Sequence, residues 1–324
     1  MRRLDNIDVR LLRVFVVLAE AHGFAEAQVA LNLSQPTLST HLAELEKRLG
    51  GQLCHRGRQQ FRLTELGQAT YEAALKLFRD LDEFSQRIAA SRGGLSGRLR
   101  IGTSDGTMTD DRLGIQTAIS MFLTSDTDVF VDLSLGTPSE LERQVADGER
   151  DIVIGPLSQK APGVVYRDFV GEPHLLYCGE GHPLFVLPDH EITKRQVDEA
   201  RFSVRSYRHF DDLYRVGHPR ASASVVHMEA QLMLILSARF IGFLPCHFAA
   251  SHVAAGRLRA IQPGTFSFTS MHKIAHRKRD EDRALISGFL DVLLRIGQET
   301  SASLSEVKPT SVVSKGGSVS VLGA

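Results

Sequence analysis

The chain has 324 residues, of which 43% are hydrophobic and 23% charged, and its 38 basic and 38 acidic side chains leave a net charge of about zero. These values fit a globular protein of more than one domain, and they exclude a globally basic nucleic-acid-binding surface. Three widely separated cysteines argue against a disulfide scaffold and favour a reducing, cytoplasmic location. We expect neither a secretory signal nor a membrane span, because the apolar runs are too short.

Residues 24–42 predict two short helices joined by a tight turn, after a first helix that Asp5 or Asp8 can cap. Ser34 is a good N-cap for the second helix of the pair, and Pro36 is tolerated in its first turn. A buried stripe is expected on this helix at Leu38, Leu42, Leu45 and Leu49. The layout is that of a helix-turn-helix, whose second helix enters the DNA major groove. The residues left facing DNA are Ser34, Gln35, Pro36, Thr37, Ser39, Thr40 and His41.

The segment 52–63 predicts a hairpin, or wing, because two strand-like runs flank a Gly-Arg turn. It carries Arg56, Arg58 and Arg62 and no acidic residue. Arginines beside a recognition helix suit contacts with phosphates, which supply affinity that does not depend on sequence. A solvated hairpin is the simpler alternative, but its place directly after the helix pair favours DNA contact by Arg56 and Arg58.

Four segments resemble the N-terminal domain of LysR-type transcriptional regulators: residues 34–39, 45–50, 53–56 and 63–67. The match runs without gaps from about residue 7 to residue 67. It departs where Gly23 replaces a usual serine cap, where Thr40 and His41 replace a common Arg-Gln pair, and where Cys54 replaces a phenylalanine. The resemblance implies a winged helix-turn-helix and sequence-specific DNA binding, but the departures leave the operator sequence open.

A long helix is predicted after Thr64, with an apolar stripe spaced by three or four residues: Leu66, Ala69, Ala73, Leu77, Leu81, Phe84 and Ile88. Such a stripe needs a partner, and a second copy of the same helix is the simplest one. Packing onto the chain's own domain is the alternative. The LysR resemblance implies a linker-helix homodimer, commonly assembled further into a homotetramer.

Beyond a Ser- and Gly-rich hinge at residues 91–97, strands and helices alternate. A helix over residues 108–123 between two strands, and further alternation beyond it, predict a parallel sheet with helices on both faces. A strand at 268–275 and a helix at 281–296 would return the chain from a second unit to the first. Two α/β lobes crossed twice by the chain resemble the effector domain of LysR regulators, which is similar to periplasmic solute-binding proteins.

These elements give the predicted domain boundaries. The first two domains are the winged helix-turn-helix at 1–64 and the linker helix at 65–92. The effector-binding domain is expected at 93–300, and residues 301–324 are expected to form a disordered tail. Within the effector domain, lobe I is expected at about 96–163 and 268–300, and lobe II at about 164–267.

Ligands of open α/β sheets bind at the carboxyl ends of the strands, near helix N-termini. Hydroxyls and amides after the first two strands of the effector domain are therefore expected to hold a carboxylate or a similar small polar group. Family position and the facing lobe give these effector contacts: Ser104, Gly106, Thr107, Thr137, Arg205 and Ser206. Helix capping is an equally good interpretation of the hydroxyls. Asp105, Asp110 and Asp111 leave the charge of the effector open, because they can complement a helix dipole, bind an amine or reject an unsubstituted acid.

Two alternative functions remain open. Cys178 and Cys246 would make a redox switch if the thiol pKa of Cys246 falls at a helix N-terminus, although inert thiols are the simpler interpretation. An enzyme fused to a DNA-binding head is the other alternative. No phosphate loop, nucleophile elbow or metal motif supports it, so we expect no catalytic residue and no cofactor. His272 and His276 lie four apart in an expected strand and give no clear metal-ligand spacing.

The sequence therefore predicts a regulator that binds double-stranded DNA as a homodimer or homotetramer and responds to a small-molecule co-inducer. The ligand must bind one arrangement of the protein more tightly than another to have any effect.

Overall fold

The structure, a computed structural model, describes residues 5–55, 61–91, 95–124, 127–158 and 160–306. Contacts divide the chain into two units, Met1–Gly93 and Gly94–Ala324. Among the described helices, none combines the length and the apolarity that a membrane crossing requires.

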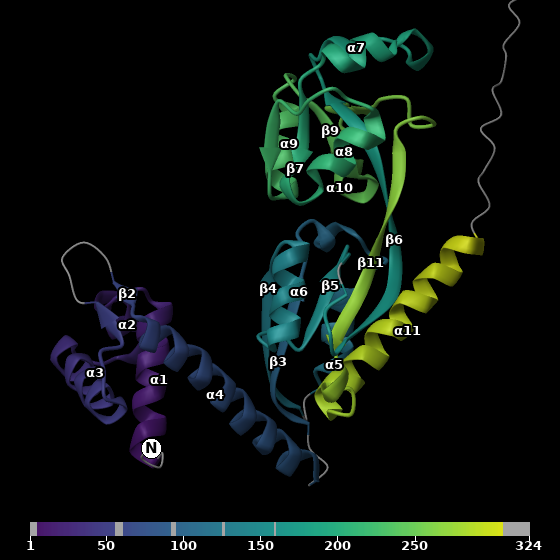
Figure 1. The fold of residues 1–324 in the computed structure, drawn as a ribbon. Helices are drawn as coiled ribbons and strands as arrows, with labels where there is room; N and C mark the ends of the chain where they lie inside the picture. The colour runs from purple at the N-terminus through teal and green to yellow at the C-terminus, as the bar shows by residue number, and fades with distance from the viewer. Residues whose placement is uncertain (1–4, 56–60, 92–94, 125–126, 159, 307–324) are drawn as a thin grey trace, which may run out of the picture. The chain divides into compact units, whose positions relative to one another are not determined.

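The first unit is a three-helix domain followed by a short hairpin and a long helix (Figure 1). Its elements are α1 (Asn6–Glu20), α2 (Phe24–Leu31), α3 (Gln35–Leu49), β1 (Cys54–His55), β2 (Arg62–Leu63) and α4 (Glu65–Ser91). Asp5 caps α1 in a capping box with Asp8, and the Ser34 side chain caps α3 by accepting from the Thr37 amide. The core joins Leu11 and Phe15 of α1 to the stripe of α3.

The predicted stripe of α3 is buried at Leu38, Leu42 and Leu45, but Leu49 is 37% exposed because it ends the helix. Arg48, in the last turn of α3, ties this end to the start of α1. Its guanidinium lies 2.9 Å from Asp8 Oδ1 and 2.9 Å from Glu44 Oε1. The wing is a two-stranded antiparallel hairpin, and Arg56 and Arg58 lie outside the described residues.

In the second unit, lobe I contains the predicted strand and helix alternation. Its elements are β3 (Ser96–Thr103), η1 (Thr107–Thr109), α5 (Ile115–Phe122), β4 (Asp128–Leu135), α6 (Pro138–Asp147), β5 (Ile152–Gly155), η5 (Lys278–Asp280) and α11 (Ala284–Glu306). The strands β3, β4 and β5 are parallel. The helices α5 and α11 pack on one face of the sheet, and α6 packs on the other.

Two long strands, β6 (Val164–Gly179) and β11 (Ser267–Arg277), connect the lobes (Figure 1). They pair with each other antiparallel from one lobe into the other. Lobe II is built around β7 (Phe202–Arg205), β8 (Ala223–Val225), β9 (Ile241–Pro245) and β10 (Leu258–Ala260). Its helices are η2 (Pro183–Phe185), η3 (Asp189–Glu191), α7 (Lys194–Glu199), η4 (Ser206–Arg208), α8 (His209–Val216), α9 (Met228–Leu236) and α10 (Cys246–Ala254). The chain therefore crosses between the lobes twice, as predicted.

Three details differ from the prediction. The sheet is mixed, because β11 returns along the chain and pairs antiparallel with both β5 and β6. The helix expected at 108–123 begins only at Ile115, since residues 107–114 form a 3-10 turn and a loop. The last helix runs to Glu306, six residues into the segment expected to be a tail, and residues 307–324 lie outside the described part.

Candidate functional site

The N-terminal end of α3 presents a polar surface. Ser34, Gln35, Pro36 and Thr40 are exposed, while Thr37, Ser39 and His41 are half-buried. Hydrogen bonds hold this end in place: the hydroxyls of Ser34 and Thr37 lie 2.8 Å apart, and the Thr40 hydroxyl donates to the Pro36 carbonyl oxygen at 2.9 Å. Gln35 remains exposed beside them, with a side chain that can both donate and accept.

The helix α4 has two different faces. One face, which includes Tyr71, Ala74 and Phe78, packs into the core of the first unit. The predicted apolar stripe follows the other face: Leu66 is 40% exposed, Leu81 38% and Phe84 65%. The alternative partner for this stripe was the chain's own first unit. Of the stripe, the half-buried Leu77 packs against the core of that unit.

Residues from both lobes meet at the middle of the two long strands. Ser104 follows β3 of lobe I, is buried, and places its hydroxyl 3.5 Å from His272 Nε2 on β11. Thr107 is also buried and donates its hydroxyl to the Ser104 carbonyl oxygen at 3.0 Å. Gly106 has φ +73°, a left-handed conformation that favours glycine, and a Cβ there would lie 3.5 Å from Met228 of lobe II.

Two arginines of lobe II lie three residues apart with different partners. Arg205 is buried and forks onto Asp212, with Nε 3.0 Å from Oδ2 and Nη2 2.5 Å from Oδ1. Its Nη1 lies 3.2 Å from His174 Nε2. Arg208 donates from Nη2 to the Ser270 hydroxyl at 2.8 Å. Within the described residues, no carboxylate lies within ion-pair distance of Arg208.

Burial lowers the pKa of Arg208, and the positive charge of Arg205 lowers it further. A desolvated guanidinium without a carboxylate partner is the kind of group to which an anionic ligand binds favourably. Ser270 and His272 share one face of β11, two residues apart, which corresponds to about 7 Å. Arg208 of lobe II, which contacts Ser270, therefore lies close to Ser104 of lobe I, which contacts His272.

Asp105 connects the lobes directly. Its carboxylate accepts from the backbone amide of Met228, the first residue of α9, and lies 3.4 Å from His227 Nδ1. It therefore caps a helix of the opposite lobe, consistent with the interpretation that these acids complement a helix dipole. Asp110 instead forks with Arg112 at 2.6 and 2.7 Å, and Asp111 is exposed.

Glu172 lies on β6, in the middle of the buried cluster. Its Oε1 lies 2.9 Å from His247 Nε2, and its Oε2 lies 3.3 Å from His174 Nε2. Burial alone would raise the pKa of Glu172, but the hydrogen bond from His247 and the neighbouring imidazoles hold it below its usual value. Burial and the charge of Arg205 lower the pKa of His174 to about 3, so this imidazole is neutral.

The other predicted effector contacts, Thr137, Ser206 and Arg205, lie outside the group formed by Ser104, Gly106 and Thr107. Thr137 caps α6 in a capping box with Glu140, which is the alternative role weighed for it, and its side chain is half-buried. Ser206 is exposed at the start of η4. The Arg205 guanidinium is already hydrogen-bonded to Asp212 and His174. The structure thus brings Ser104, Gly106 and Thr107 together, and it places Arg208 rather than Arg205 without an acidic partner.

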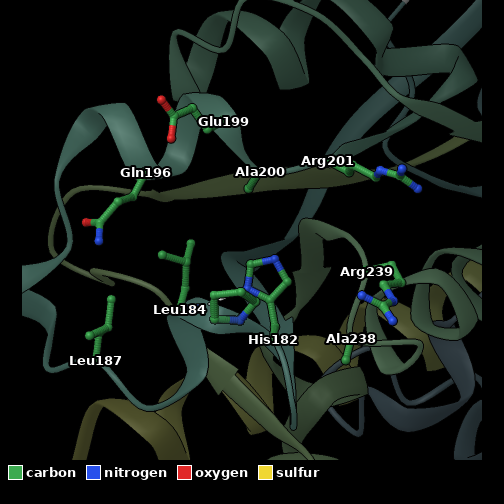
Figure 2. Close-up of a pocket in the computed structure, with 10 residues that line it drawn as sticks. His182, Leu184, Leu187, Gln196, Glu199, Ala200, Arg201, Ala238 and Arg239 are labelled. Carbon is green, nitrogen blue, oxygen red and sulfur yellow. Dashed lines mark hydrogen bonds between the residues drawn. The ribbon is translucent and has the colours of Figure 1, made fainter.

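A separate pocket of about 540 Å³ opens in lobe II, where α7 faces the turn that follows β6 (Figure 2). Its lining includes His182, Gln196, Arg201, Ala238 and Arg239. Ala238 has φ +58°, a backbone conformation that favours glycine. In this chain Ala238 lines the lobe II pocket.

Comparison with known proteins identifies the chain. The family model described as "Bacterial regulatory helix-turn-helix protein, lysR family" matches residues 9–68, and "LysR substrate binding domain" matches residues 92–297. The chain belongs to the LysR family of transcriptional regulators. It is 34% identical over 292 residues to the HTH-type transcriptional activator BauR of Pseudomonas aeruginosa, covering 90% of this chain and 96% of that protein.

Further relatives extend the same result. The SDS degradation transcriptional activation protein of a Pseudomonas species is 28% identical over 83% of this chain and 90% of its own length. Among solved structures, CbnR, a LysR family transcriptional regulator, matches with a TM-score of 0.62 and 20% identity over 89% of this chain and 99% of that chain. This LysR regulator is therefore a DNA-binding protein with an effector-binding domain, and its family and relatives are regulators rather than enzymes.

Cys178 and Cys246 of this LysR regulator are not placed to form a disulfide with each other. Burial raises the pKa of Cys178 to about 12, and burial also raises the pKa of Cys246. Cys178 pairs with Ile241 across the sheet, five residues before Cys246. At ~3.3 Å per residue the two thiols lie well beyond the reach of a disulfide.

Sequence reasoning missed Arg208, Glu172 and His247 as parts of the polar cluster where the two lobes meet. Arg208 stands three residues after Arg205, so the sequence indicated a basic residue near that point. It did not indicate that Arg208 lacks an acidic partner. Glu172 and His247 lie 75 positions apart, and only the antiparallel pairing of β6 with β9 brings them together.

Proposed function

We propose that this LysR regulator binds double-stranded DNA in the cytoplasm as a homodimer, with α3 in the major groove. The exposed polar end of α3 supports this proposal. Gln35 is suited to pair with adenine, and Pro36 and Thr37 to touch thymine methyl groups. Ser34, Ser39, Thr40 and His41 complete this surface, while Arg56 and Arg58 of the wing would contact phosphates.

The exposed apolar stripe of α4 is the observation that carries the dimer. Leu66, Leu81 and Phe84 together expose a row of large apolar side chains on a helix whose other face is already packed. A second copy of α4 would cover this row and set two copies of α3 about one DNA turn apart. Pairs of dimers would make the homotetramer that the family resemblance implies.

Selection of bound duplexes from a random pool tests this proposal. We expect the enriched sequences to contain two half-sites in inverted orientation, with centres about one helical turn apart. Phe84→Asp should convert the dimer to a monomer in sedimentation experiments and lose the paired sites, while Lys76→Asp on the same helix is the control. Enrichment of single half-sites by a wild-type monomer would contradict the dimer.

We also propose that the effector is a small molecule with a carboxylate group, which binds between the lobes. The support comes from Arg208, a half-buried guanidinium without an acidic partner among the described residues, beside the hydroxyl of Ser104. Thr107 and Gly106 shape the lobe I wall of this site. Thr137, Arg205 and Ser206 would act around it, with Arg205 fixing His174 and the η4 turn rather than contacting the ligand.

A thermal-shift screen of small carboxylic acids, each paired with its amide, tests the effector class. A ligand that binds the folded chain at one hundred times its Kd stabilises it by about 2.7 kcal/mol. We expect acids but not their amides to raise the melting temperature, and Arg208→Gln to remove the shift. Arg195→Gln, at an exposed arginine of lobe II, is the matched control. Equal shifts by acids and amides would contradict the proposal.

A further inference from the structure

We infer that the hinge between the lobes binds a divalent transition-metal cation through Asp110, Glu172 and His247, with His272 beside them. Asp110 belongs to lobe I, Glu172 to β6 and His247 to the first turn of α10 in lobe II. Asp110, Glu172 and His247 are not among the proposed effector contacts, and His272, which contacts Ser104, borders both sites.

The spacing of the ligand atoms fits one ion. His247 Nε2 lies 2.9 Å from Glu172 Oε1 and 3.6 Å from Asp110 Oδ2. His272 Nε2 lies 4.0 Å from Glu172 Oε1. Bonds of about 2.0–2.2 Å to nitrogen and oxygen place neighbouring ligands roughly 3–4 Å apart. The ligand atoms of Asp110, Glu172 and His247 all lie within 4.8 Å of one another, so small side-chain movements would bring them around one ion.

The hydrogen bonds around the cluster orient the proposed ligands. The Thr109 hydroxyl lies 3.2 Å from the Gly106 carbonyl oxygen, to which it can donate, and 2.8 Å from His247 Nδ1. Without an ion, Nε2 donates to Glu172 and Nδ1 accepts from Thr109. With an ion bound, the other tautomer would let Nδ1 donate to Thr109 and direct the Nε2 lone pair toward the metal. Metal-binding histidines characteristically donate their second nitrogen to such a partner, which fixes the ring.

Glu172 lacks donors for a buried carboxylate. His174 Nδ1 lies 3.1 Å from the Glu172 carbonyl oxygen, to which it can donate, and its Nε2 lies 3.2 Å from the Arg205 guanidinium, a permanent donor. In that tautomer His174 has no proton for Glu172 Oε2. Among the described residues, the one side-chain hydrogen bond to this carboxylate involves His247. A cation between Glu172 and His247 would replace that contact and compensate the buried charge.

The ligand chemistry selects the class of metal. Imidazole nitrogen with carboxylate oxygen suits Zn²⁺ and related first-row ions better than Ca²⁺ or Mg²⁺. Arg112 holds Asp110 through both carboxylate oxygens, and each oxygen keeps a further lone pair for an ion. Asp110, Glu172 and His272 are buried and His247 is 12% exposed, so a bare ion fits more readily than an alkylammonium group.

A bound ion would connect lobe I to lobe II, because Asp110 belongs to lobe I and His247 to lobe II. It would therefore favour the arrangement in which the two lobes are close together. The metal would act on the same lobe arrangement as the effector, but through Asp110, Glu172 and His247 rather than through Arg208 and Ser104.

The test uses the full chain without a histidine tag, freed of metal with a chelator and titrated with Zn²⁺ in a calorimeter. We expect one ion per chain, and we expect Co²⁺ at the same site to give a visible absorption band. His247→Gln should weaken Zn²⁺ binding at least tenfold. His190→Gln, at a lobe II histidine that is 81% exposed, should bind as the wild type does.

Glu172→Gln provides a second variant, and circular dichroism of every variant establishes that it is folded. A folded Glu172→Gln chain should lose Zn²⁺ binding by a similar factor. The proposal is overturned if the wild type takes up no ion, or if His247→Gln binds Zn²⁺ as tightly as the control. Stabilisation by alkylammonium ions without any metal binding would also overturn it, and would assign the cluster to an amine.

Discussion

The two units arrange their proposed contact residues differently. In the first unit these residues are neighbours in the sequence, from Ser34 to His41, and the most prominent of them are exposed on one helix end. In the second unit Ser104, Glu172, Arg208 and His247 come from four separate segments and are buried or half-buried. The first arrangement offers a continuous exposed surface to a large partner, whereas the second places its groups inside the unit, where a small partner fits. Stability should therefore depend on local contacts in one unit and on long-range pairs in the other.

The largest expected effect concerns the buried ion pair of Arg205 and Asp212, which lie seven residues apart. Arg205→Met would leave Asp212 buried without its cation, and breaking one partner of such a pair costs about 3–5 kcal/mol. Hydrogen exchange resolved by segment should show faster exchange in β7 and α8 and no change in α1. Arg205→Met combined with Asp212→Leu should recover much of the loss. An unchanged exchange rate in β7 would contradict this role.

The second prediction concerns the close contact of α4 with the wing. A Cβ on Gly67 would lie 1.9 Å from the Leu53 carbonyl oxygen, so Gly67→Ala must push α4 away from the backbone. Such overpacking costs about 1–3 kcal/mol, more than the better helix propensity of alanine returns. Hydrogen exchange should accelerate in α4 and α1 but not in β7.

Gly23→Ala is the matched control for Gly67→Ala, because a Cβ on Gly23 has no neighbour within 4 Å. Equal effects of the two substitutions on the first unit would show that the contact with Leu53 does not limit this position.

The distance in sequence between contacting residues explains which features the sequence predicted and which it did not. The cap at Ser34, the cap at Thr64 and the buried leucines of α3 depend on residues three or four apart, so periodicity located them correctly. The capping of α9 by Asp105 and the contact of Glu172 with His247 depend on sheet register over 75 to 123 positions. One sequence contains no local signal for such pairs. The choice between Arg205 and Arg208 has a different cause. Asp212 follows them by seven and four positions, so sequence spacing offers both arginines as its partner, and only the fold selects Arg205.

The smallest expected effect returns to the first unit and to its departure at residue 23. Gly23 is the N-cap of α2, and it provides no side-chain hydrogen bond to the helix. Its φ of 162° is extended backbone that a serine adopts readily, and no atom would obstruct the new side chain. Gly23→Ser should therefore slow amide exchange in the first turn of α2 and stabilise the first unit by roughly a few tenths of a kcal/mol. Because the effect is local, β7 and β9 should exchange as before. Faster exchange in α2 would mean that the glycine is required for the entry of the chain into this helix.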